Sequence, residues 1–560
     1  MASDTAGPYD PASASMPPPP LFRILKTAAS SVGNGIGDAV AAEDTLGRTA
    51  VPRMGLLALS GRKPLATPAF FAVTSRGAVP HVTPDNIVRT DLVNGAYFAL
   101  EDFVENIPLR PGRVPPIYST PASPVPTLAS ASSSPSSSSS SPLPSIPRLH
   151  TFSGLPSSTI SVLAPRRHPA AASHLGNGPA HISIITSTGF QKLTLDAYHA
   201  ALDILRPDIA VPMADLTYSG GVVSHTANNS SSTSPSAAYA SVPHPNAKRA
   251  FRMAERSEDW IDQVYRDSVA DKTGAALFAP TLPVPYATQW QYLNRLAELA
   301  APNPDEAEIS ESSTEEQAKP TVAGLAVYDV DIMQDLHADY ADTLCHLPRL
   351  SLHPAVTPHH VLRQVSLGID VMLLPAITDA SEQGLAYAFS WEEASSSSSS
   401  SLREAGSEQL PLAIDLTDPM YKADLRPLRP SCTCAACATH HRAYLHHLLD
   451  AREMLAWTLL QMHNHHVMTE LFAGIRKTLE TGGVAAFQEQ ARRFRIMYEP
   501  ELPMGQGKRP RLRGYQVKTN GVVEAPLNKP QWGRLEDVKP AAAASVVMTV
   551  VGDDQMAVDA

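Results

Sequence analysis

The chain has few cysteines and no excess of positive charge, and these two shortages exclude several classes of protein. Its 560 residues include only 4 Cys, and three of these lie within positions 432–437. A small secreted scaffold held by disulfides has many more cysteines spread along the chain. The formal net charge is −11, from 44 Lys and Arg against 55 Asp and Glu. A protein that coats nucleic acid needs a positive field, so this balance excludes that class but permits a local basic face.

Long apolar runs are also missing. Residues 1–20 contain no basic segment followed by an apolar stretch, so we expect no secretory signal there. The apolar run Ala541–Val551 is shorter than the roughly 20 residues that a membrane-spanning helix needs. We therefore expect no integral membrane segment and, by default, a cytoplasmic protein.

Proline and serine are abundant, and they divide the chain. There are 51 Pro, and several Ser-rich tracts cannot bury a core. Residues 1–20 are expected to be disordered and residues 501–560 to form a mostly flexible tail. Polar or acidic inserts are expected at about 119–147, 226–236, 303–316 and 395–401. The remainder, within residues 21–500, is long enough for one barrel-sized domain.

Between the inserts, short apolar segments alternate with segments of helical periodicity. A helix is expected over Leu195–Leu205, and another from Thr357-Pro358 to Leu367, with a hydroxyl cap at its start and Gly368 after its end. The expected strands are Leu56–Leu59, Phe70–Val73, Ile182–Ile185, Ile209–Val211, Ala323–Val327, Leu350–Leu352 and Ile369–Leu374. Repeated β-α-β units imply parallel strands joined by crossover helices. We predict an α/β fold, and a TIM (β/α)8 barrel fits the length better than an open sheet does.

The strongest chemical signal is the segment Cys432-Thr433-Cys434-Ala435-Ala436-Cys437. Three thiols this close can converge on one soft cation, and zinc favours tetrahedral sets of sulfur and nitrogen ligands. Ser431–Ala473 contains neither Gly nor Pro and repeats leucine at helical spacing, which predicts one long helix from about His441 onward.

Several histidines can supply the fourth ligand. His440 and His441 lie close to the cysteines, whereas His463 reaches them only if the chain folds back. Spacing alone does not choose among the candidates, which are His440, His441, His446, His447, His463, His465 and His466. A site with four protein ligands and no open position is structural rather than catalytic.

These residues resemble the tRNA-guanine transglycosylase family. The zinc motif of that family, Cys-x-Cys-x-x-Cys, is followed by Arg-Ala-Tyr-Leu, a long helix and a His-Asn pair. Arg442-Ala443-Tyr444-Leu445 and His463-Asn464 match these features here. The resemblance selects His463 as the fourth ligand of one structural zinc ion, beside Cys432, Cys434 and Cys437. Weaker matches occur in the family's order, so the resemblance covers about residues 45–500: Thr67-Pro68-Ala69-Phe70, Ser187-Thr188-Gly189-Phe190-Gln191 and Gly368-Ile369-Asp370.

The resemblance implies a TIM barrel with an inserted zinc subdomain, here at about 425–475, and an activity that exchanges guanine for a deazaguanine base at the wobble position of tRNA. Catalytic members use two aspartates, one of which attacks the ribose while the other supports proton transfer and base recognition. Leu373 stands at the position of the nucleophile, and Thr186 stands at the position of the second aspartate. A third acidic residue of the family reads the guanine edge, and Ala214 or Asp215 takes its place, depending on register.

Loss of both carboxylates on a retained scaffold points to a non-catalytic paralogue, so we expect no catalytic residue and no cofactor besides zinc. The resemblance implies a heterodimer with a catalytic queuine-inserting subunit, formed near the zinc subdomain. It also implies that tRNAs with GUN anticodons are bound through that complex. One alternative is an active transglycosylase that uses Asp370 or Asp215, although we interpret Asp370 as a structural hydrogen-bonding residue. Another is a zinc-dependent interaction module without a role on RNA. The basic run Lys508–Arg513 either contacts phosphates or is a solvated tail.

Overall fold

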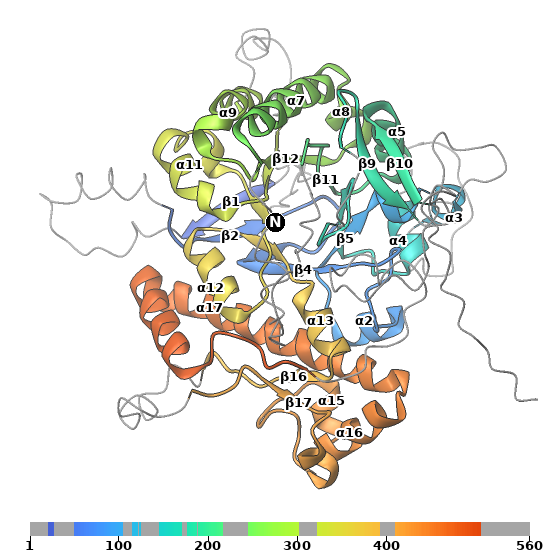
Figure 1. Cartoon of the computed structure of the whole chain (residues 1–560), viewed down its shortest axis with the longest axis vertical. Helices are drawn as coiled ribbons and strands as arrows, with labels where there is room; N and C mark the ends of the chain where they lie inside the picture. The colour runs from blue at the N-terminus through green and yellow to red at the C-terminus, as the bar shows by residue number, and fades with distance from the viewer. Residues whose placement is uncertain are drawn as a thin grey trace, which may run out of the picture.

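Eight parallel strands close into a barrel in the computed structural model (Figure 1). Their order around the barrel is β11-β12-β13-β14-β15-β4-β5-β8. The strands are β4 (Ala69–Val73), β5 (Gly95–Ala99), β8 (Ile160–Ala164), β11 (Ile209–Ala210), β12 (Ala276–Thr281), β13 (Gly324–Val327), β14 (Arg349–Ser351) and β15 (Val371–Leu373). The predicted TIM-type α/β barrel is therefore confirmed.

The structure describes residues 21–26, 50–104, 115–120, 123–124, 145–170, 176–186, 189–216, 245–301, 322–392 and 409–505. The expected disorder of residues 1–20, the inserts at 226–236, 303–316 and 395–401, and most of the insert at 119–147 lie outside these ranges. The basic run 508–513 also lies outside them. No helix in the described ranges is long and apolar enough to cross a membrane.

Large apolar side chains fill the barrel. Phe71, Tyr97, Phe278 and Leu373 belong to one buried cluster inside it. Alternate residues of a strand point inward, so each strand contributes side chains to this core in layers. The interior is thus a packed core and not a channel.

An antiparallel sheet closes one end of the barrel. It consists of β1 (Phe22–Lys26), β2 (Met54–Leu57) and β3 (Leu65–Thr67). Leu57 and Leu65 join the buried cluster of the barrel interior. The backbone of Lys63 bonds to Ser158, just before β8, so the sheet covers the amino ends of the strands.

Helices surround the barrel, and local signals predicted two of them well. The helix α5 (Leu195–Leu205) has the predicted bounds, and α12 (Pro358–Ser366) is followed by Gly368 at φ +76°. The hydroxyl of Thr357 was expected to cap α12 but makes no cap hydrogen bond. The other helices of this layer are α2 (Pro84–Thr90), α3 (Pro116–Ser119), α4 (Arg148–Ser153), α7 (Ala247–Arg266), α8 (Val269–Thr273), α9 (Tyr286–Ala300), α11 (Met333–Asp339) and α13 (Ala376–Glu382).

Two predicted strands pair antiparallel outside the barrel, and one of them, Leu56–Leu59, overlaps β2 of the closing sheet. Ile182–Ile185 lies in β9 (His181–Thr186), which pairs antiparallel with β10 (Gly189–Thr194) and not with a parallel neighbour. This hairpin stands outside the barrel, in the connection between β8 and α5. A short apolar run fits a hairpin as well as a barrel strand, because pairing depends on residues far away in the sequence.

The predicted single helix from His441 onward is wrong. The chain forms α15 (Ala435–Thr439), α16 (Arg442–Ala451) and α17 (Met454–Met497), and α17 is itself interrupted at Gly483. Arg452 adopts a left-handed conformation (φ +57°, ψ +39°) between α16 and α17. The chain reverses there, and the cost of this conformation, about 1–2 kcal/mol, is offset by burial of Leu445 and Leu460 in a second apolar cluster.

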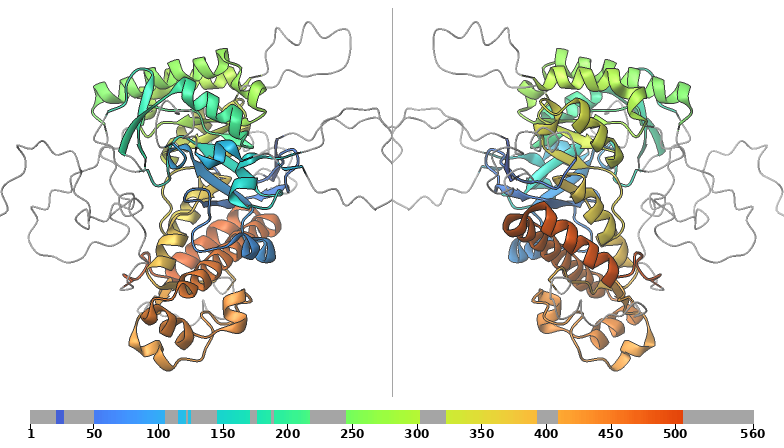
Figure 2. Two further views of the ribbon diagram at one scale, coloured as in Figure 1. Left: turned by 90° about the vertical axis from the view of Figure 1, so that its right-hand side faces the viewer. Right: turned by 90° about the vertical axis from the view of Figure 1, so that its left-hand side faces the viewer.

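The segment with α15 and α16 lies beside the barrel, and α17 runs between this segment and the barrel (Figures 1 and 2). It also contains the strand pair β16 (Leu385–Tyr387) and β17 (Ala413–Asp415). Helices α7 and α9 lie on the opposite side of the barrel. A further short pair is formed by β6 (Ser123–Pro124) and β7 (Ser145–Ile146).

Candidate metal centre

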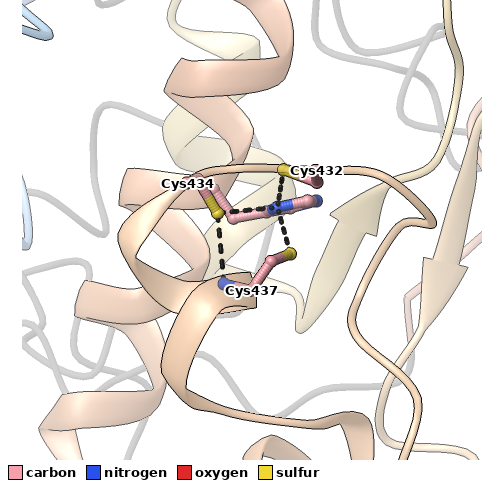
Figure 3. Close-up of side chains that lie close together, drawn as sticks. Cys432, Cys434 and Cys437 are labelled. Carbon is pink, nitrogen blue, oxygen red and sulfur yellow. Dashed lines mark hydrogen bonds between the residues drawn. The ribbon is translucent and has the colours of Figure 1, made fainter.

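The structure brings together the four residues that were predicted as metal ligands. Cys432 and Cys434 lie on the loop before α15, Cys437 lies in α15, and His463 comes from α17. One ligand atom from each lies within 4.8 Å of the other three, so the cluster can hold one metal ion. Figure 3 shows the three cysteine sulfurs arranged around one imidazole ring.

The loop is held by its own cysteines. The Sγ of Cys434 accepts a hydrogen bond from the backbone N–H of Cys437 (3.3 Å), so Cys434 caps α15. The Nδ1 of His463 is 3.7 Å from the Sγ of Cys432, and 3.4 Å from the Sγ of both Cys434 and Cys437. A single nitrogen cannot donate to three sulfurs, and a shared cation accounts for the convergence.

His463 and Asn464 of α17 both form hydrogen bonds with the backbone of Tyr387 in β16. The Nε2 of His463 donates to the carbonyl oxygen of Tyr387 (2.9 Å), and Asn464 Oδ1 accepts from the N–H of Tyr387 (2.9 Å). The carbonyl can only accept, so Nε2 carries a proton, and Nδ1 faces the sulfurs, where its lone pair would be available to a bound metal ion. Asn464 also donates to Ser381 Oγ and to the carbonyl of Leu385, both at 2.9 Å. The ring is thus oriented for ligation by residues outside the ligand set.

The electrostatics favour a positive charge at the centre of the cluster. Burial lowers the pKa of His463, but its contacts with Cys432 and Cys437 outweigh burial and raise that pKa to about 9. Hydrogen bonds from Cys434 and Cys437 lower the pKa of the Cys432 thiol. The same contacts and burial raise the pKa of the Cys434 thiol, so without a cation the three sulfurs share their negative charge unevenly, whereas a bound divalent cation favours the thiolate form of every ligand.

The remaining histidines serve other contacts. His441 Nδ1 accepts from the N–H of Tyr444 (3.1 Å) and caps α16, while the His440 ring stacks on the Tyr444 ring. His446 Nδ1 lies 2.8 Å from the carbonyl of Leu416, and His466 Nε2 lies 3.0 Å from Glu470 Oε1. His447 is exposed, and His465 is buried beside Phe70. None of the six belongs to the metal cluster that the described residues form.

A family model described as queuine tRNA-ribosyltransferase matches residues 148–496. The chain belongs to this family. Relatives named queuine tRNA-ribosyltransferase accessory subunit 2 include one from Schizosaccharomyces pombe (strain 972 / ATCC 24843), which is 31% identical over 473 residues, 84% of this chain and 87% of the relative. One from Culex quinquefasciatus is 27% identical over 306 residues, 53% of this chain and 61% of the relative. One from Xenopus laevis is 41% identical over 86 residues, 15% of this chain and 21% of the relative.

Leu373 and Thr186 are the two residues that the sequence resemblance places at the family's catalytic aspartates. Leu373 ends β15 and is 0% exposed within the apolar interior of the barrel. Thr186 ends β9, and its hydroxyl donates to the carbonyl of Gly189 (2.9 Å). Leu373 has no polar side-chain atom, and Thr186 offers a hydroxyl in place of a carboxylate, so neither side chain is an acid or base that titrates near neutral pH.

Asp370 lies at the wrong end of the barrel for catalysis. It precedes β15, whereas active sites of TIM barrels lie at the carboxyl ends of the strands. The carboxylate accepts hydrogen bonds from Arg53 Nε (3.0 Å) and from the N–H of Arg349 (2.8 Å). This geometry agrees with a structural role.

Asp215 lies at the carboxyl end of the barrel strands, where active sites are found, but its carboxylate is paired with two arginines. Its carboxylate is 0% exposed and accepts from Arg249 Nη1 and Arg256 Nη1, each at 3.0 Å, and from Asn177 Nδ2 at 2.8 Å. The neighbouring Ala214 packs into the apolar core. Sequence reasoning missed both arginines, because nothing in the spacing links them to a residue more than thirty positions away.

Proposed function

We propose that this chain is a non-catalytic subunit of a queuine tRNA-ribosyltransferase. It would pair with a catalytic subunit and support the exchange of guanine for queuine at the wobble position of tRNAs with GUN anticodons. One observation carries the proposal: Leu373 and Thr186 replace the two carboxylates, while the barrel and the Cys-His cluster are retained. Family membership and the accessory-subunit name of the S. pombe relative support the same function.

The cluster fits zinc as its metal. Zn–S bonds of about 2.3 Å and a Zn–N bond of about 2.0–2.1 Å place sulfur and nitrogen roughly 3.6 Å apart in a tetrahedron. The three S···N distances of 3.4–3.7 Å agree with that separation. Cys432, Cys434, Cys437 and His463 would hold one Zn²⁺, which would neutralise the thiolates and fasten α15 to α17. With four protein ligands the role is structural.

The alternatives are less well supported. An enzyme that uses Asp370 would need its carboxylate to leave Arg53 at the amino end of the barrel, and one that uses Asp215 would need it to leave two arginines. A metal-dependent module without a role on RNA does not account for the family match over residues 148–496.

The test is reconstitution with the catalytic homologue from the same source. Each purified chain and the co-expressed pair are assayed for exchange of labelled guanine in a tRNA transcript with a GUN anticodon. Native mass spectrometry reports pairing and metal content. We expect no exchange by this chain alone, a complex with stoichiometric zinc, and exchange by the pair. Turnover by this chain alone, or a covalent adduct between it and RNA, would overturn the proposal.

A further inference from the structure

The helix α7 carries its charges in two separate halves. Residues 247–256 contain four basic side chains and one acidic residue, Glu255, whereas residues 257–266 contain three acidic side chains and one basic residue, Arg266. We use the name α7 basic face for the four basic side chains of the first half together with Lys192 of β10: Lys192, Lys248, Arg249, Arg252 and Arg256. The chain as a whole has a net charge of −11, so this cluster of positive side chains differs in sign from the rest of the protein.

Helix stability does not account for these charges. Cations in the first turn of a helix, such as Lys248 and Arg249, oppose the helix dipole at a cost of about 0.3–1 kcal/mol each, and the dipole gives no reason for the cations further along. Lys248 and Arg252 are exposed, and within the part of the chain that the structure describes neither forms an ion pair. Their positive charge is therefore directed to solvent.

Asp215 holds the rest of this face in place. The buried carboxylate pairs with both Arg249 and Arg256, and Arg256 Nη1 also donates to the carbonyl of Asn177 (3.1 Å). One negative charge thus positions two partly exposed cations.

The hairpin β9–β10 shares this positive field. Trp260 Nε1 donates to the carbonyl of Pro179 (2.7 Å) and fixes the start of the hairpin against α7. Burial lowers the pKa of His181, and the positive charges of Lys192 and Arg256 lower it further. His181 therefore lies within the influence of both elements, and the cations of the hairpin and of α7 form one surface.

Exposed aromatic rings accompany the cations. Phe251, between Lys248 and Arg252 on α7, is 55% exposed, and Phe190, on the same face of the hairpin as Lys192, is 40% exposed. Basic side chains interleaved with exposed rings are typical of surfaces that bind single-stranded nucleic acid, where cations meet phosphates and rings stack on bases.

We propose that the α7 basic face binds the sugar-phosphate backbone of tRNA, with Phe251 stacking on an unpaired base. This inference rests on the proposed function and specifies where this subunit touches RNA. The bonds between Asp215 and α7 place the surface at the carboxyl ends of the barrel strands, where TIM barrels bind ligands. It lies on the side of the barrel away from α15 and α16, so RNA and a partner at that segment can bind together (Figures 1 and 2).

The experiment uses the full chain in complex with the catalytic subunit. The affinity for a fluorescent tRNA transcript with a GUN anticodon is measured by anisotropy across roughly 0.05–0.3 M KCl. The test variant is Lys248→Ala/Arg252→Ala. The control variant, Arg266→Ala/Lys272→Ala, removes the same charge from exposed residues at the far end of α7 and in α8. Arg266 lies about 21 Å along the helix from Arg252.

The test variant should bind roughly tenfold more weakly at low salt, and its slope of log affinity against log salt should be shallower by about 1.4–1.8, since each lost phosphate contact removes about 0.7–0.9. The control should keep the wild-type slope. Phe251→Ala should lose about fivefold in affinity without a change in slope, because stacking releases no counterion.

The outcomes separate this inference from the proposed function. A wild-type pair that forms and exchanges base, but whose test variant has the wild-type slope, would refute the basic face while leaving the function intact. Weakened pairing of the subunits by Lys248→Ala/Arg252→Ala, with unchanged tRNA binding, would instead assign the face to a protein partner and also refute the inference. Failure of the wild-type chains to pair would count against the proposed function itself.

Discussion

Arg53 and Asp370 form a buried ion pair across 317 positions of the chain. The guanidinium also donates to the carbonyls of Cys345 (2.5 Å) and Leu347 (2.7 Å), so it ties the segment before β2 to the segments before β14 and β15. The pair closes the amino end of the barrel, away from the end at which barrels carry out chemistry.

Replacing Asp370 by Asn should therefore destabilise the fold. The change leaves the charge of Arg53 buried without a counter-charge, at a cost of roughly 3–5 kcal/mol. Urea denaturation of the wild-type protein and of Asp370→Asn measures this difference in unfolding free energy. Asp329→Asn, at a side chain that is 31% exposed, is the control and should change the unfolding free energy little. A stable Asp370→Asn protein would show that the pair contributes little.

Metal content and stability should be lost together when a ligand is replaced. Cys434→Ser or His463→Ala should reduce bound zinc from stoichiometric to nearly none and lower the melting temperature, because metal-binding energy is folding energy at such a site. His447→Ala, at an exposed histidine of α16, is the matched control. Elemental analysis and calorimetry measure both effects, and unchanged metal content in the ligand variants would refute the assignment.

The parts of the fold that sequence predicted well depend on local signals. The helix α5 has its predicted bounds because Thr194 caps its start and an apolar stripe runs along it. The three cysteines were recognisable because they are neighbours in sequence. His463 needed the family resemblance, since the reversal that brings it back occurs at Arg452, a residue without a sequence signal for a left-handed turn.

The parts that sequence did not predict depend on distant partners. The pairing of β9 with β10, and the bonds from Arg249 to Asp215, follow from tertiary packing that periodicity does not encode. The role of Asp370 could be inferred as structural, but its partner Arg53 could not be named. Local sequence patterns thus predicted helices, strands and types of metal ligand. The ion pairs that hold charged side chains in place join residues distant in sequence, and only the structure shows them.

His168 should make the protein sensitive to mild acid. It follows β8, packs edge-on to the Tyr97 ring at 6.3 Å, and is buried, which lowers its pKa from 6.5 to about 4. As the pH falls from about 6.5 to 4, the unfolded chain takes up this proton before the folded one does, so stability falls by about 3 kcal/mol across that window and then levels.

The contribution of His168 to the loss of stability in acid is measured by comparing the wild-type protein with His168→Gln. The variant should lose less unfolding free energy between pH 7 and 4 than the wild type, by about 3 kcal/mol. His447→Gln should follow the wild-type curve, because His447 is exposed. Parallel curves for His168→Gln and the wild type would mean that this histidine does not resist protonation in the fold.

Restoring a carboxylate at Leu373 should not restore catalysis. Leu373→Asp places a charge in the apolar interior beside Phe71, which should cost roughly 3–5 kcal/mol, and Thr186 still lacks the second carboxylate. The variant is assayed in complex with a catalytic subunit whose own nucleophile has been replaced, so that any exchange must come from this barrel. Leu373→Asn serves as the uncharged control, and melting curves with native mass spectrometry establish that both variants still fold and pair. Guanine exchange or a covalent RNA adduct with Leu373→Asp alone would show that one carboxylate suffices and that the surrounding pocket has remained competent.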